Sequence, residues 1–292
     1  MVEEVYEEIY SLVRQIPEGM VSTYKRVAEA LGDPIAARGV AEALSINPRP
    51  IDVPCHRVVH EDLRIGGFRF GVEEKKSLLG KEGVSAENGA VRAEIFDDFK
   101  SGMVLKRMQA QQMEMSGNVD LSDGDFDLIG GFDVSYRDRF AKGALCVMNR
   151  RLEVIELRTG YALSSMPYIP TYLGFRELPL FEKLSEGLEG VLYFIDGNGI
   201  MHPRLCGSAC MMGLSADSPA IGIAKSRLLG TVEGEAVFYE DRQIGWKRGN
   251  TFISPGNRVT LQTSLDLAEG LLGHGAGPLR MAHRLARINR QP

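Results

Sequence analysis

A cysteine beside a histidine is the most reactive combination of side chains in this sequence. Cys55 and His56 lie in the stretch Pro-Cys-His-Arg-Val, residues 54–58. A thiolate is a strong nucleophile, and a neighbouring base or positive charge increases its population. The pair alone is weak evidence, because buried and unreactive cysteines are common. Its meaning depends on the sequence around it.

Three acidic residues in the second half of the chain are of the kind that binds metal ions. Alternation along a strand would place Asp133 on the same face as Gly131 and Ser135, and Asp196 directly follows an apolar run. Glu177 lies between the two aspartates in the sequence. Carboxylates gathered at strand ends suit Mg²⁺, which can activate water and stabilise the leaving oxygen of a phosphodiester. By spacing alone, isolated surface or capping acids are the alternative.

Helical patterns dominate the chain up to about residue 90. Apolar residues at helical spacing predict a helix over residues 2–15, and Ser22 can cap a second helix that ends before Gly-Asp-Pro at 32–34. A third helix is predicted over residues 35–44. Two short helices joined by a tight turn are typical of a helix-turn-helix DNA-binding motif. An ordinary helical hairpin is the alternative.

The second half changes to strand patterns. Strands are predicted over residues 128–136, 143–148, 152–158, 190–195 and 220–224. Helical stretches separate the later strands, so this half is predicted to be α/β. Residues 83–89 are predicted to form a loop, and residues 93–115 a mostly helical lead-in to the sheet.

Length and composition indicate a globular protein of two domains. The chain of 292 residues exceeds the usual size of one domain, and its 44% hydrophobic and 25% charged residues are ordinary. No apolar run approaches about 20 residues and the acidic start does not resemble a signal peptide, so a cytoplasmic location without a membrane partner is expected. The net charge of −5 argues against indiscriminate binding of nucleic acid, but not against local basic surfaces. The four scattered cysteines are expected to be reduced, and a monomer is the default expectation.

Segments on both sides of Cys55 match one family together. They are Ile-Pro-Glu-Gly-Met-Val-Ser-Thr-Tyr at 16–24, Ala-Ala-Arg at 36–38, Asn-Pro at 47–48, Pro-Cys-His-Arg-Val at 54–58, Gly-Gly-Phe at 66–68, Lys76, and Glu-Gly at 82–83. Over about residues 1–85, the chain closely resembles the catalytic domain of O6-alkylguanine-DNA alkyltransferases. The resemblance implies a small helix-rich domain of the winged helix-turn-helix type.

This resemblance implies the chemistry of the first half. Cys55 would attack the alkyl carbon on guanine O6 in an in-line displacement, with His56 acting through water as the base. Glu82 would hold the imidazole, and Asn47 would support the turn that carries the cysteine. No cofactor is expected for this step. The thioether product is stable, so each molecule should react once.

The same resemblance implies how the base reaches the cysteine. Guanine O6 cannot meet a sulfur atom inside a stacked duplex, so the nucleotide must rotate out. Tyr24 would assist this rotation, and Arg38 would enter the stack from a helix in the minor groove. Arg57 is expected to contact DNA.

A second set of segments matches another family over about residues 94–290. They are Pro-Tyr-Ile-Pro at 167–170, Phe-Arg-Glu at 175–177, Asp-Gly-Asn-Gly at 196–199, His-Pro-Arg at 202–204, and Gly-Ile-Ala-Lys at 222–225. These segments resemble endonuclease V, a family with a ribonuclease-H-like fold and a mixed central sheet. The resemblance implies incision of DNA one bond beyond a deaminated base, such as hypoxanthine, on its 3′ side.

The second resemblance also implies residue roles. Asp133 and Asp196 would bind Mg²⁺, with Mn²⁺ as an alternative, and Glu177 would complete the acidic site as ligand and catalytic group. Lys225 would approach the phosphate or the attacking water. Tyr168 would be the wedge that separates the strands.

Two further positions, His202 and Arg204, are similar to family positions near the DNA and the lesion. Two departures from the family pattern stand out: Met211 and Asn257 occupy places where the family usually has histidine. Asn257 is expected to lie closer to the reacting groups than Met211. An asparagine can orient water but cannot take a proton at neutral pH.

The combined prediction is a bifunctional DNA repair protein. Residues 1–88 are assigned to the alkyltransferase-like domain, 89–93 to a linker and 94–292 to the endonuclease V-like domain. Its partner would be double-stranded DNA that carries O6-alkylguanine or deaminated bases. One alternative is an active alkyltransferase fused to a weak or inactive lesion-binding domain, and another is an endonuclease for inosine in RNA.

Overall fold

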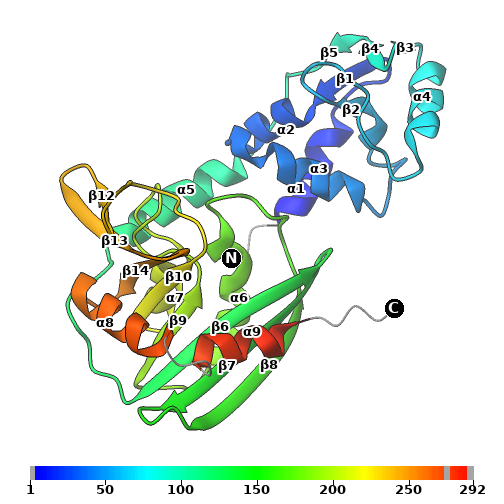
Figure 1. Ribbon diagram of the computed structural model, residues 1–292. Helices are drawn as coiled ribbons and strands as arrows, with labels where there is room; N and C mark the ends of the chain where they lie inside the picture. Colours follow the sequence, from blue (N-terminus) through cyan, green and yellow to red (C-terminus); the bar gives the residue numbers. More distant parts are fainter. Residues whose placement is uncertain (1–3, 273–276, 288–292) are drawn as a thin grey trace. The chain divides into compact units, whose positions relative to one another are not determined.

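The chain folds into two compact units in the computed structural model, which describes residues 4–272 and 277–287 (Figure 1). The first unit comprises Met1–Met108 together with Ser165–Pro170, and the second comprises Gln109–Ser164 and Thr171–Pro292. The division therefore falls inside helix α5 (Val104–Ser116).

The first unit is rich in helices, with two small β-structures. Its elements in chain order are α1 (Val5–Arg14), β1 (Met20–Thr23), α2 (Tyr24–Leu31), the 3-10 helix η1 (Pro34–Ala36), α3 (Ala37–Ser45), the 3-10 helix η2 (Cys55–Arg57), β2 (Val58–Val59), α4 (Val72–Lys81), β3 (Ser85–Glu87), β4 (Ala90–Arg92) and β5 (Glu94–Ile95). Strands β2, β1 and β5 form a parallel sheet in that order, and β3 and β4 form an antiparallel hairpin.

The predicted helix-turn-helix arrangement is present as α2, η1 and α3. The side chain of Thr23 accepts a hydrogen bond from the backbone N–H of Arg26, so Thr23 rather than the predicted Ser22 caps α2. Ser22 is buried in β1. The helix ends at Gly32, whose φ of 105° is a left-handed conformation that favours glycine.

Two short strands, β3 and β5, lie in segments for which no strand was predicted. The segment predicted as a loop contains β3, and the predicted helical lead-in begins with β5, since its helix starts only at Val104. The first residues of the predicted first helix, Val2 and Glu3, lie outside the described residues. Strands of two or three residues are too short to show an alternating pattern, so their pairing comes from tertiary contacts.

The second unit is built on one mixed sheet of nine strands. Its elements in chain order are β6 (Leu128–Arg137), β7 (Phe140–Asn149), β8 (Val154–Leu163), α6 (Leu173–Ser185), β9 (Val191–Asp196), α7 (Ser208–Ser215), β10 (Ala220–Ala224), β11 (Thr231–Glu233), β12 (Ala236–Tyr239), β13 (Arg242–Arg248), β14 (Thr251–Asn257), α8 (Leu261–Leu272) and α9 (Pro278–Ala286). The strand order is β11-β12-β13-β14-β10-β9-β6-β7-β8. Strands β6, β9 and β10 run parallel to one another, and the other pairs are antiparallel.

Helices cover both faces of this sheet (Figure 1). On one face, Phe132 and Tyr193 pack against Phe181 of α6 and Met212 of α7. On the other face, one buried cluster includes α8, and a second joins β7 to α9. The five predicted strands and the mixed α/β fold class are confirmed. None of the helices in the described part of the chain is long and apolar enough to cross a membrane.

Helix α9 lies so close to β6 that the strand requires a glycine there. A Cβ added at Gly131 would fall on the backbone of Pro278 and Leu279, well inside contact distance. Glycine costs backbone entropy within a strand, so its presence here is explained by the approach of the helix.

We predict that Gly131→Ala lowers the free energy of unfolding by at least about 2 kcal/mol, because the backbone of α9 must move to admit one methyl group. Urea denaturation measures this change. Gly270→Ala in α8 is the matched control, since among the described residues nothing outside the local helix backbone lies within 4 Å of a Cβ added there. Alanine at that helical position should raise stability by up to about 1 kcal/mol. Equal stability of Gly131→Ala and the native chain would contradict the close approach.

Candidate functional site

Cys55 lies on a turn that an asparagine braces. The side-chain amide of Asn47 donates one hydrogen bond to the carbonyl of Val53, at 3.2 Å, and contacts the Cys55 Sγ at 3.5 Å. Its amide oxygen accepts from the N–H of Arg49 at 2.9 Å. Asn47 is fully buried and Cys55 is 4% exposed. The structure thus shows Asn47 supporting the turn and offering a donor to the sulfur.

His56, Arg57 and Glu82 form one buried ion-pair network. The Nε2 of His56 lies 2.8 Å from the Oε1 of Glu82. Arg57 donates to the same carboxylate through Nε and Nη2, at 2.9 and 2.8 Å, and through Nη1 to the carbonyl of Ile16. The structure places Arg57, for which a contact with DNA was expected, against Glu82: its side chain is 17% exposed and its guanidinium braces that carboxylate.

The network leaves one nitrogen of His56 able to take a proton. A carboxylate only accepts hydrogen bonds, so Glu82 assigns the proton of a neutral imidazole to Nε2. The Nδ1 atom is buried, and within the described residues no group hydrogen-bonds to it. Nδ1 is therefore the basic atom of His56.

Burial sets the charges around the thiol. It raises the pKa of Cys55, although the hydrogen bond from Asn47 and the charges of Lys75 and Arg69 oppose this shift. Burial also lowers the pKa of His56, against the stabilising effect of Glu82. Both groups are therefore neutral before reaction, and a proton must leave Cys55 as it reacts.

Lys75 is a buried cation that sequence reasoning missed. Its Nζ donates to the carbonyls of Val58 and Gly67, at 2.6 and 3.2 Å. Burial lowers its pKa to about 8, and only a thiolate at Cys55 would oppose that shift. The resemblance had pointed to Lys76, which instead pairs with Glu73 at the surface. Adjacent lysines on one helix give no sequence signal for which of them faces inward.

Cys55 opens onto a cavity of about 500 Å³. Its lining includes Tyr24 from the start of α2, His60 and Phe68, together with Ala41 and other residues of α3. The rings of Tyr24 and His60 meet edge to face at 5.5 Å. This volume and mostly apolar lining suit a flat heterocyclic base. The structure thus brings Tyr24 and α3, which carries the exposed Arg38, to the same cavity as the thiol.

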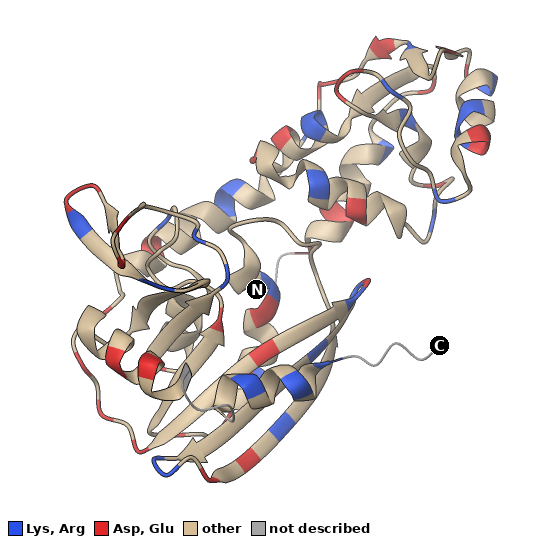
Figure 2. Ribbon diagram, viewed as in Figure 1, with Lys and Arg blue, Asp and Glu red and all other residues tan. Residues whose placement is uncertain are grey.

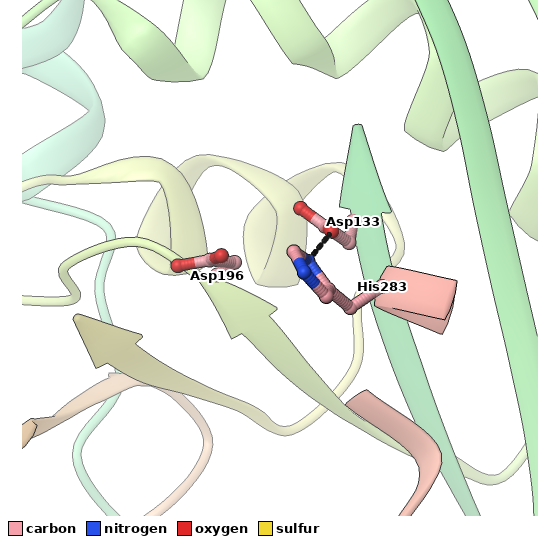
Figure 3. Close-up of side chains that lie close together, drawn as sticks. All are labelled: Asp133, Asp196 and His283. Carbon is pink, nitrogen blue, oxygen red and sulfur yellow. Dashed lines mark hydrogen bonds and ion pairs between the residues drawn. The ribbon is translucent and has the colours of Figure 1, made fainter. Parts of the chain in front are cut away.

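In the second unit, the two predicted aspartates meet at neighbouring strands. Phe132 of β6 pairs with Ile195 of β9, so Asp133 and Asp196 are the next residues along parallel strands. The ligand atoms of Asp133, Asp196 and His283 all lie within 4.8 Å of one another (Figure 3). The Nδ1 of His283 lies 2.7 Å from the Oδ2 of Asp133. Two carboxylates and an imidazole suit a divalent cation such as Mg²⁺ or Mn²⁺.

The alternation predicted for β6 is confirmed by α9. Gly131 admits the backbone of α9, Asp133 contacts His283, and the hydroxyl of Ser135 donates to the carbonyl of Ala286. Sequence reasoning missed His283, which lies 150 residues from Asp133. The signal available was a histidine on a strongly amphipathic helix in a chain with only five histidines.

Glu177 lies near this cluster, but it comes from a helix on the other face of the sheet. It is 6% exposed and comes from α6, which packs on the face opposite α9. Burial raises the pKa of Glu177 well above its ordinary value, and the charges of Asp133 and Asp196 add to the shift. Among the described residues, the set within 4.8 Å includes His283 rather than the predicted Glu177.

The surroundings of the acidic cluster are cationic. Burial and Asp133 raise the pKa of Asp196, and Lys225 and His283 oppose this shift. Asp196, exposed Lys225 and Arg280 line a cavity of about 320 Å³. Helix α9 contains no acidic residue, and Figure 2 shows its basic residues in blue. Lys225 is thus at the cluster, as expected, where a phosphate could bind.

Asn257 is not at this cluster, and the expectation that it lies close to the reacting groups is wrong. It pairs with Ala220 at the start of β10, whereas Asp196 pairs with Ile223 near the end of that strand, about 10 Å farther along. Its amide donates to the carbonyls of Gly213 and Ser218, at 3.3 Å, and accepts from a backbone N–H.

Met211 is likewise a packing residue. Its side chain is fully buried in α7, where the sulfur packs against Gly174 of α6 and contacts the amide of Gln112. Neither departure from the family pattern therefore removes a group from the acidic cluster.

His202 and Arg204, expected near the lesion, are both engaged in holding Thr171. The Nε2 of His202 lies 2.9 Å from the Thr171 carbonyl, and Arg204 donates to that carbonyl and to the hydroxyl. Burial lowers the pKa of His202 to about 4, so it stays neutral. Thr171 has a φ of 70°, which is unfavourable for a β-branched residue. The two side chains thus stabilise a strained position directly after Pro170.

Tyr168 is 44% exposed, as a wedge must be. It belongs to the segment Ser165–Pro170, which folds with the first unit. The structure therefore does not bring Tyr168 together with the acidic cluster in one unit.

Two family matches divide the chain close to residue 108, although the later match also spans Ser165–Pro170 of the first unit. Residues 109–284 match endonuclease V, and residues 4–84 match the DNA-binding domain of 6-O-methylguanine DNA methyltransferase. Among solved structures, human endonuclease V superposes with a TM-score of 0.55 at 24% identity, covering 63% of this chain and 96% of that chain. Endonuclease V from Streptomyces avermitilis gives 0.55 at 27% identity, covering 62% and 91%.

Two relatives are similar over nearly the whole chain. A bifunctional methyltransferase/endonuclease of Picrophilus torridus is 36% identical over 96% of this chain and 95% of its own length. A protein of the same description from Thermoplasma volcanium is 38% identical over 96% of this chain and 89% of its own length. The chain therefore belongs to the endonuclease V family, in its fused form as a bifunctional methyltransferase/endonuclease.

Proposed function

We propose that the first unit transfers an alkyl group from O6-alkylguanine in DNA to Cys55, and that the second unit incises DNA 3′ to deaminated bases such as hypoxanthine. The observation that supports alkyl transfer best is the cavity that Cys55 shares with Tyr24, with the His56–Glu82 pair behind it. The observation that supports incision best is the cluster of Asp133, Asp196 and His283.

In alkyl transfer, Cys55 Sγ attacks the alkyl carbon, and the new S–C bond forms as the bond from carbon to guanine O6 breaks. The thiol proton moves through a water to Nδ1 of His56, and the carboxylate of Glu82 stabilises the imidazolium that results. Asn47 donates to the developing thiolate. Burial and Cys55 raise the pKa of Tyr24, so its hydroxyl keeps the proton with which it hydrogen-bonds the departing guanine.

Nucleotide rotation has its own residues in this proposal. Arg38 is exposed on α3, where it can fill the space that the rotated nucleotide leaves. Because the thioether has no route back to a thiol, each molecule reacts once.

For incision, Asp133, Asp196 and His283 would hold Mg²⁺ or Mn²⁺. When bound, the cation supplies a more acidic water and neutralises charge on the leaving oxygen. Glu177 is the group best able to exchange a proton here, since its pKa is raised next to two carboxylates. Lys225 would bind the scissile phosphate, and exposed Tyr168 would separate the strands. Since Asn257 and Met211 lie away from the cluster, they give little support to an inactive nuclease.

We predict that Cys55→Ala abolishes the mass increase of the protein after incubation with an O6-methylguanine duplex, because the acceptor sulfur is gone. Incision of a hypoxanthine duplex should be unchanged. Cys146→Ala is the control, since Cys146 is buried in the second unit and burial raises its pKa to about 11. A methylated Cys55→Ala protein would contradict the assignment, and intact-protein mass spectrometry detects it.

The rate of alkyl transfer should depend on pH through His56. Because burial lowers its pKa below 6.5, the imidazole is a base at neutral pH, and the rate should fall only below pH 6.5. Glu82 raises this pKa, so Glu82→Gln should move the fall to still lower pH and slow transfer at neutral pH about 100-fold. Single-turnover rates from pH 4 to pH 9 measure both effects, with the exposed Glu73→Gln as the control. A profile that is unchanged in Glu82→Gln would contradict the role of His56.

His283→Ala should slow incision by at least about 100-fold, because the cluster loses its imidazole ligand. The Mn²⁺ concentration at half-maximal rate should rise, and alkyl transfer should stay unchanged. Arg284→Ala on the same helix is the control, since its side chain is exposed. Gel assays of hypoxanthine duplexes, with parallel inosine-containing RNA, measure the rates. A native rate in His283→Ala would remove His283 from the site.

A further inference from the structure

The segment Ser165–Pro170 is an integral part of the first unit. Its Ser165 carbonyl accepts a hydrogen bond from the N–H of Tyr6 in α1, at 3.2 Å. Met166 and Ile169 are each 1% exposed, whereas Tyr168 between them remains open to solvent. The apolar residues therefore anchor the segment, and the side chain of Tyr168 remains accessible to a binding partner.

Helix α3 is shaped to receive this segment. A Cβ added at Gly39 would lie 2.9 Å from Cγ1 of Ile169 and 3.1 Å from the carbonyl oxygen of Tyr168. Both distances are shorter than ordinary contacts, and the second involves backbone. Glycine is unfavourable inside a helix by about 1 kcal/mol relative to alanine, so Gly39 is explained by the close fit of the segment.

This contact places two exposed side chains at neighbouring backbone positions. Arg38 directly precedes Gly39, and Tyr168 carries the carbonyl that Gly39 admits. From the 3.1 Å contact and standard backbone dimensions, the Cα atoms of Arg38 and Tyr168 are at most about 11 Å apart. That span equals about three base steps of DNA, and the grooves are about 6 and 12 Å wide. A duplex bound at one residue therefore occupies the space around the other.

We propose that α3 and the segment Ser165–Pro170 form a single binding surface for one duplex, so that O6-alkylguanine and hypoxanthine duplexes are bound one at a time. The proposal rests on the proposed roles of Arg38 and Tyr168 in opening the stack. Two side chains that both enter the base stack within three steps cannot serve two separate duplexes, because each duplex needs its own groove at the surface. The two repair reactions then compete for the protein.

Competition between two lesion duplexes tests this proposal. The rate of methyl transfer from an O6-methylguanine duplex to the full chain is measured while a hypoxanthine duplex is added, with a chelator present to prevent incision. Direct binding of the hypoxanthine duplex is measured under the same conditions. We expect transfer to slow at least 10-fold at saturation, with an inhibition constant equal to the directly measured dissociation constant. An undamaged duplex should inhibit about 10-fold more weakly.

A native transfer rate in the presence of saturating, directly bound hypoxanthine duplex would overturn the shared surface and leave the proposed activities intact. If the hypoxanthine duplex binds no better than undamaged DNA, the lesion class proposed for the second unit is overturned as well.

A pair of glycine variants tests whether the contact between α3 and the segment Ser165–Pro170 causes the competition. Gly39→Ala should displace the segment from α3 and raise the inhibition constant of the hypoxanthine duplex at least 10-fold. Gly80→Ala in α4 is the matched control. In the part of the chain that the structure describes, nothing outside the local helix backbone lies within 4 Å of a Cβ added there, so this variant should leave inhibition unchanged. An unchanged inhibition constant in Gly39→Ala would overturn the contact between α3 and the segment as the origin of the competition.

Discussion

The close approach of α9 to β6 is the contact on which the acidic site depends. Gly131 has no side chain, so the backbone of α9 reaches the strand, and His283 comes within hydrogen-bonding distance of Asp133. The bond from Ser135 to Ala286 secures the far end of the helix. Sheet and helix therefore determine the distance between a carboxylate and an imidazole through main-chain contact, which is more rigid than contact between side chains.

The two sites handle buried charge in opposite ways. In the first unit, the carboxylate of Glu82 meets Arg57 and His56, and these hydrogen bonds lower its pKa although burial alone would raise it. In the second unit, burial raises the pKa values of Glu177 and Asp196, and the charges of the neighbouring carboxylates add to the shift. A site in which the positive and negative side chains balance one another suits a reaction between neutral groups. A site with surplus negative charge suits a cation.

Strand positions and the residues at their ends could be predicted from the sequence, because alternation and apolar runs are local. Such patterns predict the face of the strand on which Asp133 lies and the position of Asp196 at a strand end. The resemblance predicts Asn47 at the turn and Tyr24 near the reactive cysteine. His283 could not be predicted to join Asp133, because 150 residues of chain must fold before they meet. The inward side of Lys75 and the position of Asn257 at the wrong end of β10 likewise depend on packing and register. Strands β3 and β5 are too short to carry a pattern of their own.

The membership of Ser165–Pro170 in the first unit limits how such a fused protein can arise or be divided. If the gene were divided between the two halves, the first unit would lose the six residues Ser165–Pro170, which are encoded far downstream. Helices α1 and α3 would then be exposed where this segment packs on them. The exposed surface at Gly39 and Tyr6 would then need new polar residues to remain soluble. The two halves carry separate chemistry, but a short segment of the second half of the sequence folds with the first unit. We therefore expect substitutions near residues 39 and 169 to be correlated among related proteins.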